Sequence, residues 1–283
     1  MKRYRNNLSG TAAFRSFIPT PLQEVQIELD EELNALLSEA ESAVESLNER
    51  CFTPEEINSL EQEEAKSSWQ LSSGKNDSPF GLCFGGTTFS EEDHCEIDDI
   101  VAATNYGIEA MEELPLSTRL FKQIHYLVAR SSRYEKKYPG EYRNSPVWIG
   151  RVGSDLRTAQ FVAPVEEDMI PAITDLENYI NYDASVHPLI QAALIHYQFE
   201  AIHPFIDCNG RVGRIINTLF FIERGILKYS ILPLSESLKR VAAQYYVLLQ
   251  EVSDTGNYNG WITFFLKMIT DAAATSNRIL TDE

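Results

Sequence analysis

The sequence has few cysteines, few basic residues and no long apolar run. Its four cysteines, Cys51, Cys83, Cys95 and Cys208, match neither a disulfide framework nor a zinc site. The 24 lysines and arginines are outnumbered by 42 acidic residues, and this net charge of −18 argues against a nucleic-acid or membrane surface. No segment has the apolar length of a transmembrane helix or a secretory signal. We therefore expect a cytoplasmic protein with reduced thiols, no nucleic-acid partner and no membrane partner.

The residues that are present favour a helical protein. Hydrophobic residues make up 43% of the chain, enough for a large core. Apolar residues recur at helical spacing in the ranges 26–50, 53–71, 91–113, 118–130, 169–181, 189–202, 211–224, 235–252 and 261–273. Residues 147–149 and 159–162 have the character of short strands and predict a small β-hairpin. Pro19 and Pro21 predict an extended arm over residues 1–22. The pattern therefore predicts an all-α bundle with one hairpin.

One segment, called the signature segment below, stands out: His203-Pro-Phe-Ile-Asp-Cys-Asn-Gly-Arg-Val-Gly-Arg214. Pro204 cannot continue the helix predicted before it, so we expect His203 at the C-terminal edge of that helix. The following helix is expected to stop at Gly225. Residues 207–210 then form a short loop that leads into a helix N-terminus, where unpaired backbone N–H groups bind anions.

The side chains of the signature segment suit phosphate chemistry. Arg211 and Arg214 lie three residues apart on one helical face, where two guanidinium groups can bind successive phosphates. Asp207 is a hard oxygen ligand of the kind that binds Mg²⁺ together with phosphates and water. His203 has an unperturbed pKa suited to a general base near neutral pH. The combination is far more specific than any of these residues alone.

The signature segment resembles the Fic signature, His-Pro-Phe-x-Asp/Glu-Gly-Asn-Gly-Arg-x-x-Arg. One position departs from it, because Cys208 stands where the family usually has glycine. The resemblance extends along most of the chain. Other similar stretches are residues 17–22, 139–143, 147–150, 192–200, 245–246 and 261–266.

The resemblance implies a Fic-type helical bundle with a hairpin flap beside the active site. Residues 1–115 would be an N-terminal arm and helices that pack on the core, with a loop at 72–88, and residues 116–283 would be the catalytic core. Fic proteins typically transfer AMP from ATP to a hydroxyl side chain of a target protein. The resemblance therefore implies a protein adenylyltransferase that uses ATP and Mg²⁺.

The resemblance also implies roles for individual residues. His203 would take the proton of a Ser, Thr or Tyr hydroxyl of the target, and Asp207 would hold Mg²⁺. The nucleotide would be bound by Phe205, Asn209, Gly210, Arg211, Arg214, Tyr245 and Leu249, the last two forming an apolar wall for adenine. The target would lie along the hairpin at residues 147–162 by strand addition. A homodimer is left open.

A serine is expected at a regulatory position. Many Fic proteins carry Ser/Thr-x-x-x-Glu-Gly/Asn, whose glutamate pairs with the second signature arginine and blocks the productive ATP pose. Aligning residues 68–73 with this motif places Ser72 at the glutamate position. A neutral serine cannot form a charge-assisted bond with Arg214. A misaligned helix end is the alternative explanation.

Two other functions are alternatives to AMP transfer. If position 208 requires a positive φ, the Cβ of Cys208 costs about 1 kcal/mol or more. That cost would fit a weakly active Fic-like regulatory or binding protein, or an AMP-removing relative. A metal hydrolase could use His196, His203 and Asp207, but no His-x-x-x-His pair supports it.

Overall fold

The computed structural model describes residues 3–72, 89–151 and 153–281. The loop predicted at 72–88 lies outside these residues except for Ser72, which ends a helix. The described chain is mostly helical with two small antiparallel sheets, which confirms the predicted class. No helix in the described ranges has the length and apolarity needed to cross a membrane.

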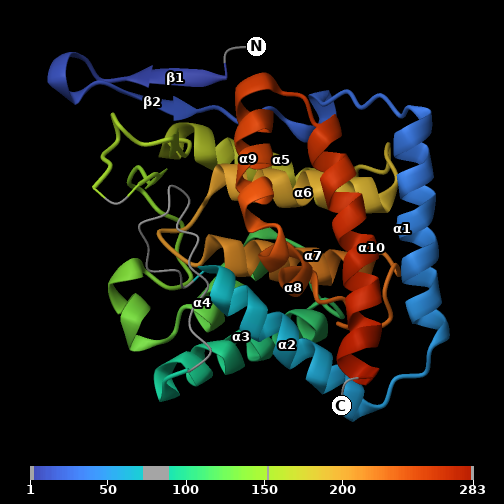
Figure 1. Cartoon of the computed structure of the whole chain (residues 1–283). Helices are drawn as coiled ribbons and strands as arrows, with labels where there is room; N and C mark the ends of the chain where they lie inside the picture. The colour runs from blue at the N-terminus through green and yellow to red at the C-terminus, as the bar shows by residue number, and fades with distance from the viewer. Residues whose placement is uncertain (1–2, 73–88, 152, 282–283) are drawn as a thin grey trace.

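Two buried helices, α6 (Pro188–Ile202) and α7 (Asn209–Glu223), pack against each other at the centre of the molecule (Figure 1). Every residue of α6 from Leu189 to Phe199 is buried. Such a helix has no polar face and must be surrounded by other elements. The connection between α6 and α7, residues 203–208, is therefore held on a rigid frame.

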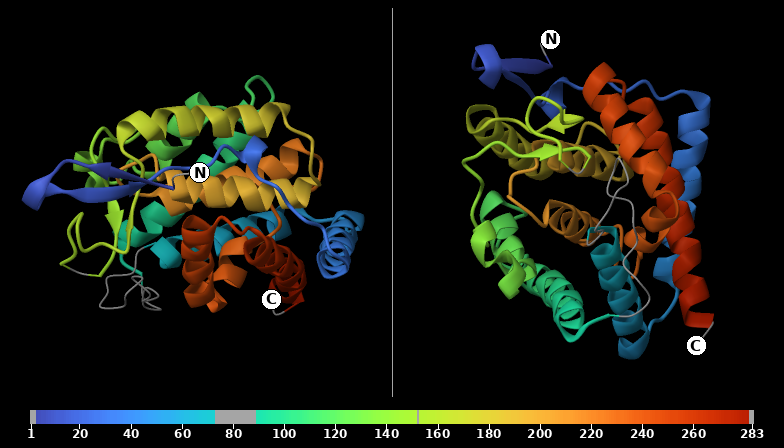
Figure 2. Two further views of the ribbon diagram at one scale, coloured as in Figure 1. Left: turned by 90° about the horizontal axis from the view of Figure 1, so that it is seen from above. Right: turned by 60° about the vertical axis from the view of Figure 1, so that its left-hand side comes forward.

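Other helices enclose this central pair, as the views in Figure 2 show. They are α1 (Glu31–Glu49), α2 (Pro54–Ser72), α3 (Glu91–Ala110), α4 (Thr118–Val128), α5 (Glu166–Tyr182), α8 (Leu234–Arg240), α9 (Ala242–Thr255) and α10 (Asn259–Thr281). Helices α2, α3 and α4 contact α7, whereas α5, α9 and α10 contact α6. Trp261 fixes α10 to α6, because its Nε1 donates a hydrogen bond to the Ala193 carbonyl at 2.7 Å.

The predicted helices match the observed ones in type and order. The helix predicted at 26–50 begins at Glu31, and the one predicted at 261–273 continues to Thr281. One predicted range needs a larger correction. The range predicted as a single helix at 235–252 is two helices, α8 and α9, which meet at Val241. Val241 has φ −124° and ψ 22°, outside the helical region, although no glycine or proline marks the break. The start of α8 is set by a distant residue, since Glu64 Oε2 accepts from the Ser235 N–H at 2.7 Å.

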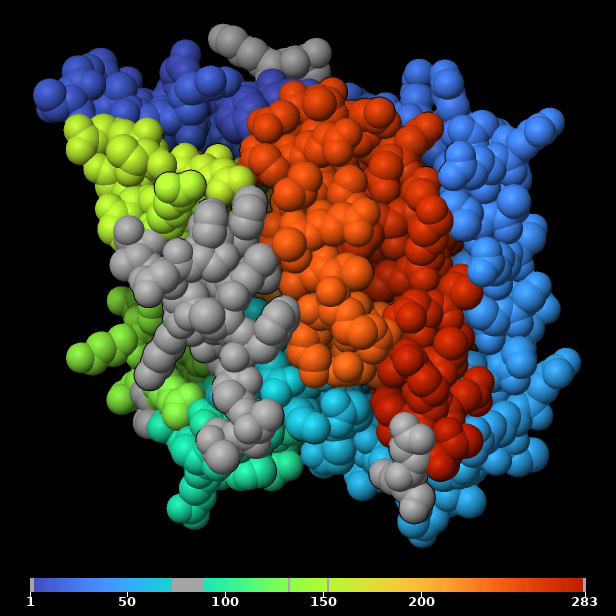
Figure 3. All heavy atoms as spheres, in the orientation of Figure 1, coloured from blue at the N-terminus to red at the C-terminus, as the bar shows by residue number. Residues whose placement is uncertain are grey.

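The predicted hairpin is confirmed, and a second hairpin was missed. Strands β3 (Trp148–Ile149) and β4 (Phe161–Val162) pair antiparallel, with Trp148 opposite Val162. In the N-terminal arm, β1 (Tyr4–Asn7) and β2 (Phe14–Phe17) also pair antiparallel, and short 3₁₀ turns lie at Gly10–Ala12 and Leu22–Glu24. The two hairpins are neighbours, with the Phe17 and Phe161 rings 5.5 Å apart. Figure 3 shows the arm bordering the segment that carries β4.

Candidate active site

The loop of the signature segment begins and ends with a left-handed residue. His203 follows the last residue of α6 with φ 50°, and Cys208 precedes the first residue of α7 with φ 59°. This confirms His203 at the helix edge and shows that position 208 requires a positive φ. The first helical bond of α7 runs from the Val212 N–H to the Cys208 carbonyl. The N–H groups of residues 209–211 therefore have no acceptor within the helix, as an anion site requires.

Arg143 holds the start of this loop. Its guanidinium is 3% exposed and donates to the carbonyls of His203 (2.7 Å), Pro164 (2.7 Å), Ile202 (3.1 Å) and Ser145 (3.1 Å). It thereby satisfies carbonyls at the C-terminal end of α6, where a positive charge also suits the helix dipole. Arg143 ends the stretch 139–143 that resembles Fic proteins, but no role was predicted for it.

His125 anchors the loop to the core through Phe205 and Asp207. The His125 ring stacks on Phe205 at 3.8 Å between centroids, Nδ1 accepts from the Gly140 N–H at 2.8 Å, and Nε2 donates to the Asp207 carbonyl at 3.2 Å. Phe205 is 0% exposed. The predicted nucleotide contact of Phe205 is therefore wrong for its side chain, which lies in the core. The expectation of a packed His125 is confirmed.

Asn209 also acts within the loop. Its Oδ1 accepts from the Phe205 N–H at 2.8 Å, and its Nδ2 donates to the Phe205 carbonyl at 2.9 Å. The side chain is 2% exposed. Asn209 therefore fixes the shape of the turn, and its contact with a phosphate stays a prediction. Gly210 serves close packing, because a Cβ there would lie 3.0 Å from Nη1 of Arg214.

His203 is placed to act as a base. Its Nδ1 lies 3.3 Å from the Glu200 carbonyl, which can only accept, so Nδ1 carries the proton and Nε2 presents a lone pair. Burial, with the nearby Arg143 charge, lowers the pKa of His203 to about 4. The imidazole is therefore neutral at physiological pH, the form that accepts a proton.

Asp207 presents a half-exposed carboxylate beside the loop. Its Oδ1 accepts from the Cys208 N–H at 2.8 Å, and Oδ2 lies 3.7 Å from Nζ of Lys137. Lys137 belongs to a 3₁₀ turn, η3 (Ser132–Lys137), which the sequence patterns did not predict. One carboxylate oxygen is thus hydrogen-bonded, and the other already attracts a cation.

Arg214 is covered by the end of α2. Its Nε donates to Ser68 Oγ at 2.9 Å, and its Nη2 donates to the Ser68 carbonyl at 2.9 Å and to Ser72 Oγ at 2.8 Å. Ser72 therefore contacts the arginine as the motif alignment predicted. Among the described residues no salt bridge joins Arg214 to an acidic side chain, although its charge lowers the pKa of Glu64 and of Glu200 against the effect of burial.

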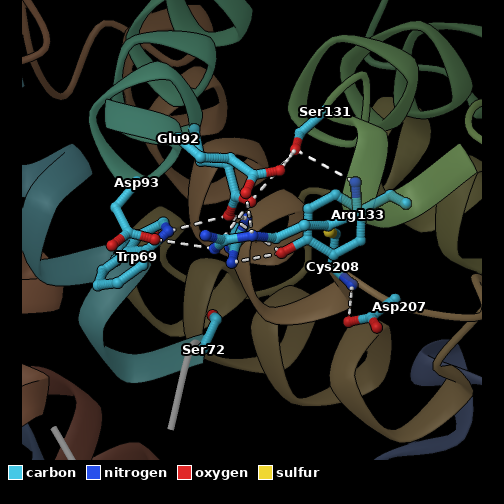
Figure 4. A network of polar contacts seen from close by, with 12 residues as sticks. Trp69, Ser72, Glu92, Asp93, Ser131, Arg133, Asp207 and Cys208 are labelled. Atoms are coloured by element: carbon cyan, nitrogen blue, oxygen red, sulfur yellow. Dashed lines mark hydrogen bonds and ion pairs between the residues drawn. The ribbon is translucent and has the colours of Figure 1, made fainter. Parts of the chain in front are cut away.

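Arg211 lies in a buried ionic network. Figure 4 shows the polar contacts in this part of the site, with Trp69, Arg133 and Cys208 among the labelled residues. The guanidinium is 2% exposed, with Nη1 3.2 Å from Glu96 Oε2 and Nη2 donating to the Tyr134 hydroxyl at 2.9 Å. Its charge is neutralised by Glu96, a residue 115 positions away that no local pattern could indicate. The predicted phosphate contact of Arg211 therefore does not fit this arrangement.

The thiol of Cys208 is buried and protonated. Its side chain is 5% exposed, and burial raises the pKa of the thiol to about 12. A reactive thiolate beside the nucleotide would have been a second way for Cys208 to disturb the site, and this environment excludes it at neutral pH. Cys208 therefore costs free energy through its backbone conformation, not through the charge of its thiol.

A small cavity, called the α9 cavity below, lies between α6, α9 and the β3–β4 hairpin. Its lining includes Glu200, Tyr246, Leu249, Gln250 and Phe161. Leu249 lines this cavity, and its contact with adenine stays a prediction. Tyr246, and not Tyr245, is the tyrosine of α9 that lines the cavity.

Tyr245 itself lies in the core. It is 4% exposed, and its hydroxyl lies 3.0 Å from Nε2 of His196. The prediction that Tyr245 contacts adenine is wrong because this face of α9 packs against α6 and α10. His196 is correspondingly buried, as expected, and no group of three or more His, Cys, Asp or Glu residues suited to a metal occurs in the described ranges. The hydrolase alternative finds no support.

Comparison with known proteins agrees with this geometry. Residues 115–221 match the model of the Fic/DOC family, so the chain contains a Fic/DOC family domain. It is 27% identical over 185 residues to protein adenylyltransferase Fic of Drosophila willistoni, covering 64% of this chain and 33% of the relative. The corresponding Drosophila grimshawi protein is also 27% identical over 185 residues and is covered to 34%. The chain thus spans about a third of the length of these relatives.

Solved structures show the same fold. A Fic family protein from Desulfovibrio desulfuricans superposes with a TM-score of 0.71 at 21% identity, covering 92% of this chain and 77% of that protein. A Fic domain containing signaling protein from Bacteroides thetaiotaomicron gives a TM-score of 0.59 at 16% identity, covering 89% and 98%. The predicted Fic-type bundle is therefore confirmed as a fold.

Proposed function

We propose that this protein is an adenylyltransferase that transfers AMP from ATP to a Ser, Thr or Tyr hydroxyl of a target protein. The observation that carries the proposal is the placement of His203. It is neutral, it projects from a left-handed turn at the end of α6, and its Nδ1 is held by the Glu200 carbonyl. The family match and the distant adenylyltransferase relatives support the same activity.

The transfer is an in-line displacement. The target hydroxyl oxygen forms a bond to the α-phosphorus of ATP, the bond from that phosphorus to the bridging oxygen breaks, and pyrophosphate leaves. The hydroxyl proton passes to Nε2 of His203. Positioning and charge stabilisation dominate the rate of such reactions.

Asp207 is the residue that would hold Mg²⁺. Its side chain is half-exposed, and Oδ2 lies 3.7 Å from Nζ of the cationic Lys137, so a carboxylate oxygen is available to a cation. With a single carboxylate ligand, phosphate and water oxygens would complete the shell, as Mg²⁺ commonly requires. Bound there, Mg²⁺ supplies neutralisation of the phosphate charge.

The remaining parts of the site would each bind a different part of ATP or of the target protein. The N–H groups that open α7 suit the α-phosphate, and Arg214 suits the outer phosphates once Ser68 and Ser72 move from its donors. The α9 cavity is the place for adenine, although its volume of about 50 Å³ is smaller than a nucleotide pocket and it would have to widen first. The β3–β4 hairpin, with Trp148 44% exposed, offers an edge for the target's modified segment.

One observation favours a second candidate, a weakly active Fic-like regulatory or AMP-removing protein. Both signature arginines are occupied, Arg211 by Glu96 and Tyr134 and Arg214 by two serines. A nucleotide must displace the serines before it binds. A low basal rate of transfer is therefore expected, and the amount transferred distinguishes the candidates.

The His203→Ala variant tests the proposal. We expect AMP transfer to fall about 10²- to 10⁴-fold, because general base catalysis contributes that much, while ATP affinity stays close to the parent's. The measurement incubates each protein with α-labelled ATP, Mg²⁺ and a cell lysate, and calorimetry follows ATP binding. Transfer at the parent rate would exclude His203 as the base, and labelled protein in neither sample would exclude the activity.

A further inference from the structure

The carboxylate of Glu96, on α3, connects two elements of the site. It is 0% exposed. Its Oε2 accepts from Trp69 Nε1 at 2.9 Å and from the Tyr134 hydroxyl at 3.1 Å, and it lies 3.2 Å from Arg211 Nη1. Its Oε1 lies 3.3 Å from Arg133 Nη1. A buried carboxylate is stable only when it is paired in this way.

The Trp69 N–H, which Glu96 accepts, links this network to the end of α2 that covers Arg214. Trp69 lies beside Ser68 and three residues before Ser72, the two serines that accept the N–H groups of Arg214. Trp69 is 6% exposed, so its indole reaches inward to Glu96. The end of α2 is therefore held by Arg214 on α7 and by Glu96 on α3, and also by α8, where Lys239 donates to Ser67 and Gln70.

We propose that Glu96 is a positioning residue that holds the end of α2 over Arg214 and so restricts access of the nucleotide phosphates to that guanidinium. The proposal rests on the proposed function, because it assigns Arg214 to the phosphates of ATP. Hydrogen bonds to a charged group are stronger than neutral ones, so the Trp69–Glu96 bond contributes to holding α2 in place. Loss of this bond would let the serines leave Arg214 more readily.

Two variants weaken this link to different extents. Trp69→Phe removes the N–H donor and keeps an aromatic ring in the core, whereas Glu96→Gln removes the charge that balances Arg211. We expect Trp69→Phe to lower the KM for ATP about threefold to tenfold with kcat nearly unchanged, since His203 is untouched and only access to Arg214 improves. Glu96→Gln is expected to change KM in the same direction, with a larger loss of thermal stability.

A matched control lies on the same helix. Asp99 is also on α3, is 6% exposed and pairs with Arg130 at the surface. The Asp99→Asn variant therefore loses a buried charge on α3 without affecting α2. Its KM for ATP is expected to equal the parent's.

Hydrogen–deuterium exchange separates the inference from the proposed function, because it requires no turnover. We expect amides in residues 62–72 to exchange several-fold faster in Trp69→Phe and Glu96→Gln than in the parent and in Asp99→Asn. Unchanged exchange in Trp69→Phe would overturn the inference, whatever the activity. Faster exchange with an unchanged KM would overturn the restriction of access. Faster exchange without AMP transfer in any form would overturn the proposed function alone.

Discussion

Cys208 shows how one side chain can destabilise a turn. It occupies the left-handed region with φ 59°, at the position where the Fic signature has glycine. Residues other than glycine adopt this conformation at a cost of about 1–2 kcal/mol. The structure thus confirms the conformational objection raised from the sequence, while the buried, protonated thiol removes the chemical one.

We predict that Cys208→Gly stabilises the fold and raises AMP transfer. Relief of the backbone cost should outweigh the added freedom of the unfolded chain and raise the Tm by about 2–4 °C for a chain of this size. A turn without strain should also aim the N–H groups of α7 better at the α-phosphate. Leu8→Gly is the control, since Leu8 has φ 55° but is 73% exposed in the N-terminal arm. Equal or lower transfer by the Cys208→Gly variant would contradict the prediction.

At the scale of elements, the end of α2 is where a single substitution can alter the access of ATP to Arg214. Position 72 is within reach of Arg214, since the Ser72 hydroxyl oxygen accepts from its Nη2 at 2.8 Å. We predict that Ser72→Glu raises the KM for ATP about tenfold or more, because a charged acceptor competes with the phosphates far better than a hydroxyl does. Initial rates over a range of ATP concentrations measure the effect.

Asn58→Glu is the matched control for this change. Asn58 is exposed on the same helix, roughly 20 Å before Ser72 at 1.5 Å per residue. It therefore adds the same charge to the protein without reaching Arg214. If both variants show the parent's KM, Ser72 does not lie where a carboxylate can compete with ATP.

Local signals predicted most elements, and two of the failures have a common cause. Thr53 and Glu56 form a capping box at the start of α2, with N–H donations of 3.2 Å and 2.8 Å between them, and such a box is a local sequence signal. By contrast, the break at Val241 and the pairing of Arg211 with Glu96 depend on residues far away in sequence. A periodic pattern gives the type of an element and its apolar face, but it cannot give the partner of a buried charge.

At the scale of the whole molecule, burial changes the protonation of several side chains in opposite directions. It lowers the pKa of His125, His196 and His203 to about 4, 3 and 4, from an ordinary value of 6.5. These histidines are neutral in the folded protein and become charged more easily when it unfolds. Their contribution to stability is complete above pH 6.5 and is lost as the pH falls toward 4.

Two partly buried carboxyl groups oppose this trend. Burial raises the pKa of Glu64 and of Glu200 to about 7, from an ordinary value of 4.5. Glu200 Oε1 has no hydrogen-bond partner among the described residues, so its ionised form is poorly solvated. The stability contributed by these groups is complete below pH 4.5 and is lost as the pH rises through 7. Together with the histidines, they place the maximum of stability near pH 6.5.

We therefore predict that the Tm falls between pH 6.5 and pH 8, and that Glu200→Gln reduces this fall. Glutamine cannot ionise, so the variant loses one of the two titrations that destabilise the folded state in this window, which should preserve about 2–4 °C for each 1 kcal/mol saved. Thermal unfolding at pH 6.5, 7.25 and 8 measures the difference. Glu251→Gln is the control, because Glu251 is exposed on α9 and should follow the parent. A fall in Tm as steep in Glu200→Gln as in the parent would show that Glu200 is already ionised and solvated in the folded protein at neutral pH.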